Sequence, residues 1–114
     1  MQLSYKDVWL SFFKYTQYRT SLLISGDELQ AKEGACFDQE NQPILKFSKK
    51  FKGQLEDLEK RGYQLASVHV NFIVYWEEEE TEEEILIVLP ELHFKKTTNP
   101  IGRINQAANV PSAT

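Results

Sequence analysis

Two histidines and a glutamate, His69, Glu91 and His93, are the residues of this chain best suited to hold a metal ion. They fall in two segments of alternating apolar residues, which predict two antiparallel strands. In the register that pairs Phe72 with Val88, His69 lies opposite Glu91, and His93 follows two residues along on the same face. Two imidazoles and a carboxylate are typical of zinc ligands and of acid–base catalysis. A solvated polar end of the sheet is the alternative interpretation.

A run of glutamates, EEEETEEE, separates the two segments. It holds seven of the 17 acidic residues, and the remaining ten are outnumbered by 13 Lys and Arg. A net charge of −4 with one concentrated acidic segment disfavours a general nucleic-acid binder, which would be strongly basic. The run is typical of a solvated hairpin tip, and it also suits docking on a basic partner protein. The partner-binding candidates are Glu77, Glu78, Glu79, Glu80, Glu82 and Glu83.

Three lysines, Lys49, Lys50 and Lys52, follow a predicted helix start at Ser48. The free backbone N–H groups of a helix N-terminus favour anions, so these lysines form a candidate anion site. The alternative is a surface patch neutralised by solvent or by the acidic tip of another subunit. The neighbouring aromatic residues are predicted core positions, which again disfavours nucleic acid as the partner.

Cys36 is the single cysteine, so neither an internal disulfide nor a multi-cysteine zinc site is expected. We predict a buried apolar residue and a cytoplasmic protein. The sequence has no Walker loop, dinucleotide fingerprint, HExxH or GxSxG motif, so no cofactor is predicted. Its longest aliphatic run, 85–89, is far below the roughly 20 residues that cross a bilayer, so no membrane partner is predicted.

The elements that must position these residues follow from the hydrophobic periodicity. Apolar residues at helical spacing predict a first helix from Ser4 to about Tyr15. Its end stays open: Leu22 and Leu23 allow a continuation to Gly26, whereas alternation favours a short strand over 20–25. A hairpin with strands over 28–37 and 44–47 follows. A second helix is predicted over 49–61, between a Ser48 cap and a Gly62 stop. Strands over 66–76 and 85–94 then form a long hairpin, and Pro90 places the second of them at a sheet edge.

This order, helix–hairpin–helix–hairpin, predicts an α+β fold with two helices packed on one face of a four- or five-stranded mainly antiparallel sheet. We expect residues 1–96 to form a single domain and 97–114 to form a flexible polar C-terminal tail. Helices on one face would leave the other face of the long hairpin uncovered. The candidates for a subunit interface or an apolar ligand pocket are Trp9, Phe13, Ile73, Tyr75, Ile85 and Ile87.

We therefore expect a small non-catalytic binding or regulatory protein that acts through protein–protein contacts. It is expected to be a homodimer whose acidic hairpin tip docks on a basic partner. Two alternatives stay open at this point. One is a small metal-dependent enzyme that uses His69, Glu91 and His93, and the other is a carrier of a small apolar ligand.

Overall fold

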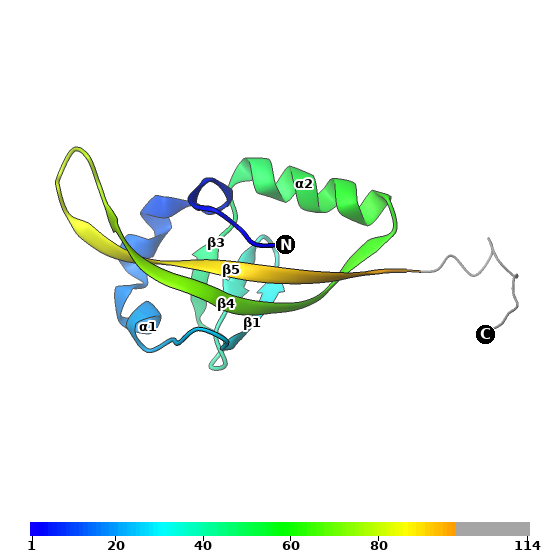
Figure 1. Cartoon of the computed structure of the whole chain (residues 1–114), viewed down its shortest axis with the longest axis horizontal. Coiled ribbons are helices and arrows are strands. Elements are labelled where there is room, and N and C mark those ends of the chain that lie inside the picture. Colours follow the sequence, from blue (N-terminus) through cyan, green and yellow to red (C-terminus); the bar gives the residue numbers. More distant parts are fainter. Residues whose placement is uncertain (98–114) are drawn as a thin grey trace, which may run out of the picture.

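The structure, a computed structural model, describes residues 1–97 and contains a five-stranded antiparallel sheet (Figure 1). The strands lie in the order β3-β2-β1-β4-β5, so β3 and β5 are its edges. The predicted α+β class and antiparallel sheet are confirmed. The strand bounds are β1 Glu28–Lys32, β2 Ala35–Phe37, β3 Pro43–Lys46, β4 Tyr63–Glu77 and β5 Glu84–Lys96.

The helix α2 (Lys49–Lys60) begins and ends close to the predicted residues. Ser48 caps it, because its hydroxyl accepts a hydrogen bond from the Phe51 N–H at 3.2 Å. Gly62 follows the helix with a φ of +91°, a conformation that side-chain-bearing residues rarely adopt. Phe51 is buried in the core, and Leu55 packs against it.

The predicted first helix is not confirmed. Its place is taken by two short 3₁₀ helices, η1 (Tyr5–Asp7) and η2 (Leu10–Tyr15), and by a short α1 (Gln17–Ser21). The strand predicted over 20–25 is also missing from the sheet, because α1 begins before it and a turn follows. Two helices on one face of the sheet are therefore not confirmed either.

The break between η1 and η2 has a backbone cause. Val8 forms an antiparallel bridge with Phe47, and the Trp9 N–H donates to the Lys46 carbonyl at 2.8 Å. Because the backbone groups of Val8 and Trp9 pair with residues at the end of β3, they are not available for the hydrogen bonds of a continuous helix. The predicted start at Ser4 is nevertheless present as a capping box around η1.

The first hairpin contains one strand more than predicted. A turn at Glu33 and Gly34, with φ of 53° and +77°, divides the expected strand 28–37 into β1 and β2. β2 then pairs with β3 across the polar turn that the sequence indicates.

The long β4–β5 hairpin has the predicted register only in part. His69 pairs with Glu91 as predicted. The register then shifts by one residue between Val70 and Phe72, and Phe72 pairs with Leu89 instead of Val88. A bulge at Asn71 therefore makes the predicted pairs beyond it wrong by one position.

The N-terminal segment, residues 1–9, forms backbone hydrogen bonds with both edges of the sheet. At the β5 edge, the Leu3 N–H donates to the Pro90 carbonyl at 3.0 Å, and the Leu92 N–H donates to the Met1 carbonyl at 2.8 Å. At the β3 edge, Trp9 is bound as described above. β5 is an edge strand of the sheet as Pro90 predicts, but this part of its edge is covered by the same chain.

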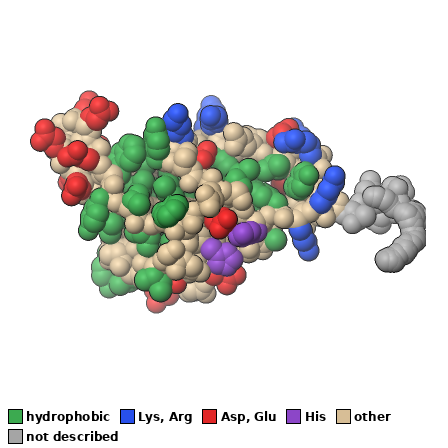
Figure 2. Space-filling view, in the orientation of Figure 1, with side chains coloured by type: hydrophobic (Ala, Val, Ile, Leu, Met, Phe, Trp, Pro, Cys, Tyr) green, Lys and Arg blue, Asp and Glu red, His purple; other side chains and the backbone are tan. Residues whose placement is uncertain are grey.

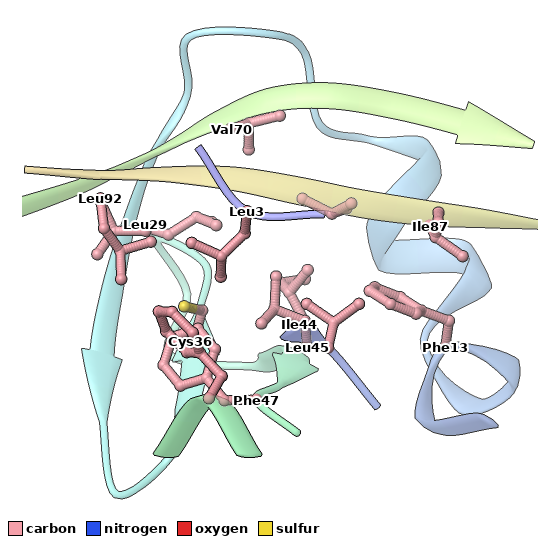
Figure 3. Packing of buried hydrophobic residues seen from close by; sticks show 14 of the residues in the cluster. Leu3, Phe13, Leu29, Cys36, Ile44, Leu45, Phe47, Val70, Ile87 and Leu92 are labelled. Carbon is pink, nitrogen blue, oxygen red and sulfur yellow. The ribbon is translucent and has the colours of Figure 1, made fainter. Parts of the chain in front are cut away.

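Within residues 1–97, a cluster of buried hydrophobic residues lies between the sheet, η2 and the N-terminal segment (Figure 3). Phe13 enters it from η2, next to Ile87 of β5, and both are almost fully buried. Of the predicted tail, only Thr97 belongs to the described residues, and its N–H donates to the Gly62 carbonyl at 2.6 Å. The remainder, 98–114, lies outside them.

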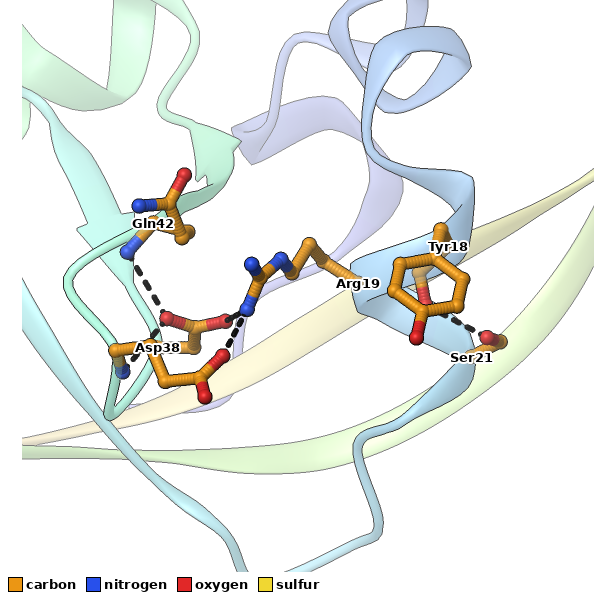
Figure 4. A network of polar contacts seen from close by, with 6 residues as sticks. Tyr18, Arg19, Ser21, Asp38 and Gln42 are labelled. Atoms are coloured by element: carbon orange, nitrogen blue, oxygen red, sulfur yellow. Dashed lines mark hydrogen bonds and ion pairs between the residues drawn. The ribbon is translucent and has the colours of Figure 1, made fainter.

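A polar network fastens α1 to the turn between β2 and β3 (Figure 4). The Arg19 guanidinium pairs with Glu40 and, at 3.5 Å, with Asp38. The other oxygen of Asp38 accepts the Glu40 and Gln42 N–H groups at 2.9 Å each. The hydrogen bond to Glu40 raises the pKa of Arg19, so the Arg19 guanidinium stays positively charged between the two carboxylates.

Cys36 is fully buried, as predicted, and burial raises the pKa of its thiol to about 12. We expect the native protein at pH 8 to resist a thiol reagent, and the protein in urea to react at once, because the reagent attacks the exposed thiolate. A Tyr15→Cys variant is the labelled native control, since Tyr15 is 85% exposed. Equal labelling of Cys36 in both states would contradict this.

The raised pKa of Cys36 makes the free energy of unfolding depend on pH. The folded state holds the Cys36 proton more tightly than the unfolded chain, whose thiol has an ordinary pKa of about 8.5. The resulting stabilisation is complete below about pH 8.5 and is lost as the pH rises from there towards 12. A Cys36→Ala variant should lack this component of the alkaline loss.

Candidate functional site

The two histidines and Glu91 do lie close together, near the middle of the hairpin strands. The ring centroids of His69 and His93 are 5.9 Å apart in an edge-to-face arrangement, and His93 Nε2 lies 3.7 Å from Glu91 Oε1. A protonated His93 would therefore pair with Glu91. Within residues 1–97, however, no three His, Cys, Asp or Glu side chains form a group that could hold a metal ion. The metal site stays a prediction.

The acidic run forms the tip of the β4–β5 hairpin, which projects from the body (Figure 1). Two backbone hydrogen bonds close this tip, from the Glu78 N–H to the Glu83 carbonyl at 3.0 Å and from the Glu82 N–H to the Glu78 carbonyl at 2.8 Å. Glu78 also pairs with Lys14 of η2 at 2.8 Å. The hydrogen bond to Glu78 raises the pKa of Lys14, and the charge of Glu83 adds to this effect. The other tip glutamates, Glu77, Glu79, Glu80, Glu82, Glu83 and Glu84, are exposed.

Apolar side chains lie on the hairpin directly below this tip. Phe72 is 54% exposed and Tyr75 69% exposed, and Val74 between them is also exposed. Figure 2 shows hydrophobic side chains gathered between the acidic tip and the two histidines. Phe72 and Val74 share one face of β4 and Tyr75 lies on the other, and we call these three exposed residues together the apolar patch.

The structure separates the six predicted interface or pocket residues into two kinds. Phe13, Ile85 and Ile87 lie in the core, and Ile73 is partly buried against it. Trp9 and Tyr75 are exposed and remain available for a contact. The sequence did not single out Phe72 and Val74 as surface residues, because the bulge at Asn71 was not foreseen.

The predicted anion-site lysines are also divided. Lys49 and Lys52 line a groove of about 800 Å³ with Lys6, Tyr5 and Trp9 of the N-terminal segment. Lys50 instead lines a separate hollow. Sequence reasoning missed Lys6 because it lies far from the others along the chain and reaches them only through the bridge between Val8 and Phe47.

A second, smaller space of about 300 Å³ lies between α2 and the sheet. Its walls include the apolar residues Leu55, Leu65 and Phe94, and also the charged residues Lys32 and Glu59. None of the residues predicted for an apolar ligand lines this space, so that alternative stays a prediction.

Comparisons with protein-family models, with curated proteins and with solved structures find nothing that matches this chain. Among the residues that the structure describes, no helix has the length and apolar character needed to cross a membrane. The function must therefore be argued from the surface itself.

Proposed function

We propose that the protein is a non-catalytic binding protein whose β4–β5 hairpin docks on a partner protein with a basic surface. The observation that carries this proposal is the position of the exposed apolar patch directly beside the acidic tip. Apolar area supplies affinity when it is covered, whereas the charges beside it attract and orient the partner.

Two properties of the tip support docking over simple solubility. The Lys14–Glu78 ion pair and the two backbone hydrogen bonds give the tip a defined shape. The remaining glutamates are exposed around it, so their charge is available to a partner. A dense negative charge on a projecting element raises the rate of encounter with a positive surface, and salt weakens this effect.

The proposal includes a homodimer formed through the same hairpin. Backbone groups of Met1 and Leu3 already pair with β5, and those of Trp9 pair with the end of β3. The exposed side chains Phe72 and Tyr75 are therefore better placed for a subunit contact than these paired stretches of the sheet edges. The single, buried Cys36 supports a cytoplasmic location as part of the same proposal.

Photo-crosslinking in the cells that make the protein tests the proposal. A photoreactive phenylalanine analogue replaces Tyr75, or Tyr18 as the matched control, since Tyr18 is a comparably exposed tyrosine on α1. We expect discrete adducts from position 75 and none of these from position 18. An adduct with a different, basic protein supports docking, and an adduct of two copies of the chain supports the homodimer. No adduct, or the same adducts from both positions, would overturn the proposal.

A further inference from the structure

We propose that the groove between the N-terminal segment and the start of α2 binds a small phosphorylated compound that carries an aromatic ring, of the mononucleotide kind. This site is separate from the hairpin and does not depend on the function proposed above. Its walls combine aromatic rings with lysines, and the two kinds of side chain suit the two parts of such a ligand. The lining includes the aromatic residues Tyr5 and Trp9 and the lysines Lys6, Lys49 and Lys52.

The positive charge of the groove indicates that its ligand is an anion. Lys6, Lys49 and Lys52 line it, and among the described residues of its lining none is Asp or Glu, although the whole chain has a net charge of −4. The nearby Asp7 carboxylate accepts hydrogen bonds from the Ser4 N–H at 2.8 Å and from the Ser4 hydroxyl at 3.2 Å. It is thus held in the cap of η1. The first N–H groups of α2 add to the positive potential beside Lys49.

The aromatic walls indicate that the ligand carries a ring that can stack on them. Trp9 is 53% exposed and Tyr5 42% exposed, although large aromatic side chains are usually more buried. Lys46 Nζ lies 5.6 Å from the centre of the Trp9 ring, and Tyr5 packs on Trp76 with ring centroids 4.8 Å apart. Both rings are therefore supported by neighbours while keeping area for a stacked ligand.

The two walls are held in place by the backbone. The Trp9 N–H donates to the Lys46 carbonyl at 2.8 Å, and the Ser48 N–H donates to the Asp7 carbonyl at 2.8 Å. The Lys52 side chain packs closely on Gly34, where an added Cβ would lie 2.9 Å from Lys52 Cδ. A groove built in this way is largely formed before its ligand arrives, which lowers the ordering cost of binding.

Size separates a small ligand from a polymer. The groove measures about 800 Å³, within the range of small-molecule sites. A single-stranded nucleic acid would need a track of about four or more nucleotides and contacts beyond the groove. We therefore commit to a free mononucleotide-like compound, and binding of a strand is an outcome of the test.

The test is calorimetric titration of the full chain with adenosine 5′-monophosphate, adenosine and inorganic phosphate as probes. We expect the monophosphate to bind more tightly than either of its parts. Lys49→Gln with Lys52→Gln should weaken it by about tenfold or more, because charged hydrogen bonds are lost. Lys50→Gln is the matched control and should leave the affinity unchanged, since Lys50 lines a different hollow.

Trp9→Ala should weaken the monophosphate roughly 5- to 150-fold by loss of stacking, and Trp9→Phe, which keeps a ring, should restore most of the affinity. Circular dichroism of each variant confirms that it is folded. No binding by the wild type at about 5 mM monophosphate would overturn the proposal, since a dissociation constant of 1 mM already corresponds to only about −4 kcal/mol. Tighter binding of an oligonucleotide, weakened equally by Lys50→Gln, would overturn it in favour of a strand-binding surface.

Discussion

Changing Glu79, Glu80 and Glu82 to glutamine is expected to slow association with the basic partner by about tenfold or more at low ionic strength. These three residues are exposed at the tip, and the change leaves the Lys14–Glu78 ion pair intact. The reason is that the partner is drawn to the tip by long-range attraction, which these charges supply. The rate constant is measured by stopped-flow mixing with the protein that crosslinks to position 75.

A matched variant separates steering by the tip from an effect of total charge. Glu33, Glu56 and Glu59 are exposed on the body, and changing them to glutamine alters the net charge by the same amount. We expect this variant to associate almost as fast as the wild type. At about 1 M salt, where charges are screened within roughly 3 Å, all three proteins should have similar rates. Equal slowing by the body variant would contradict a specific role of the tip.

Phe13→Ala is expected to lower the free energy of unfolding by about 3–5 kcal/mol, because it removes a fully buried aromatic ring and leaves a cavity. Such a loss is a large part of the roughly 5–15 kcal/mol that stabilises an ordinary domain. Urea unfolding measures it. Tyr15→Ala is the control on the same 3₁₀ helix, and we expect almost no change because Tyr15 is 85% exposed.

The Phe13 prediction concerns the role of η2. If this segment closes the core, as its contact with Ile87 indicates, the two variants must differ by several kcal/mol. Similar stabilities of Phe13→Ala and Tyr15→Ala would mean that η2 is a loosely attached segment and that the core is formed by the sheet and α2.

The elements that the sequence predicts correctly are those whose signals are local. α2 has its Ser48 cap and Gly62 stop within the segment itself, and the long hairpin has two alternating runs around one polar turn. The first helix fails for the opposite reason. Its spacing and its cap at Ser4 are helical, but Val8 and Trp9 bind the end of β3, a partner that local periodicity does not reveal.

The same distinction applies to the candidate sites. The pairing of His69 with Glu91 lies on the near side of the bulge and is confirmed, whereas the exposure of Phe72 depends on the bulge and was not foreseen. Lys49 was recognised from its place at a helix start. Its neighbours Lys6 and Trp9 join it through tertiary contacts, so the complete groove could be found only in the structure.

Hydrogen exchange of the full chain, free and with its crosslinked partner, tests the central claim most directly. The claim is that the β4–β5 hairpin is the docking surface. It predicts that amides of the tip, 77–84, and of the adjoining apolar patch exchange more slowly in the complex, while those of α2 are unchanged. Protection confined to α2 or to the N-terminal segment, with the tip exchanging as in the free protein, would contradict the claim.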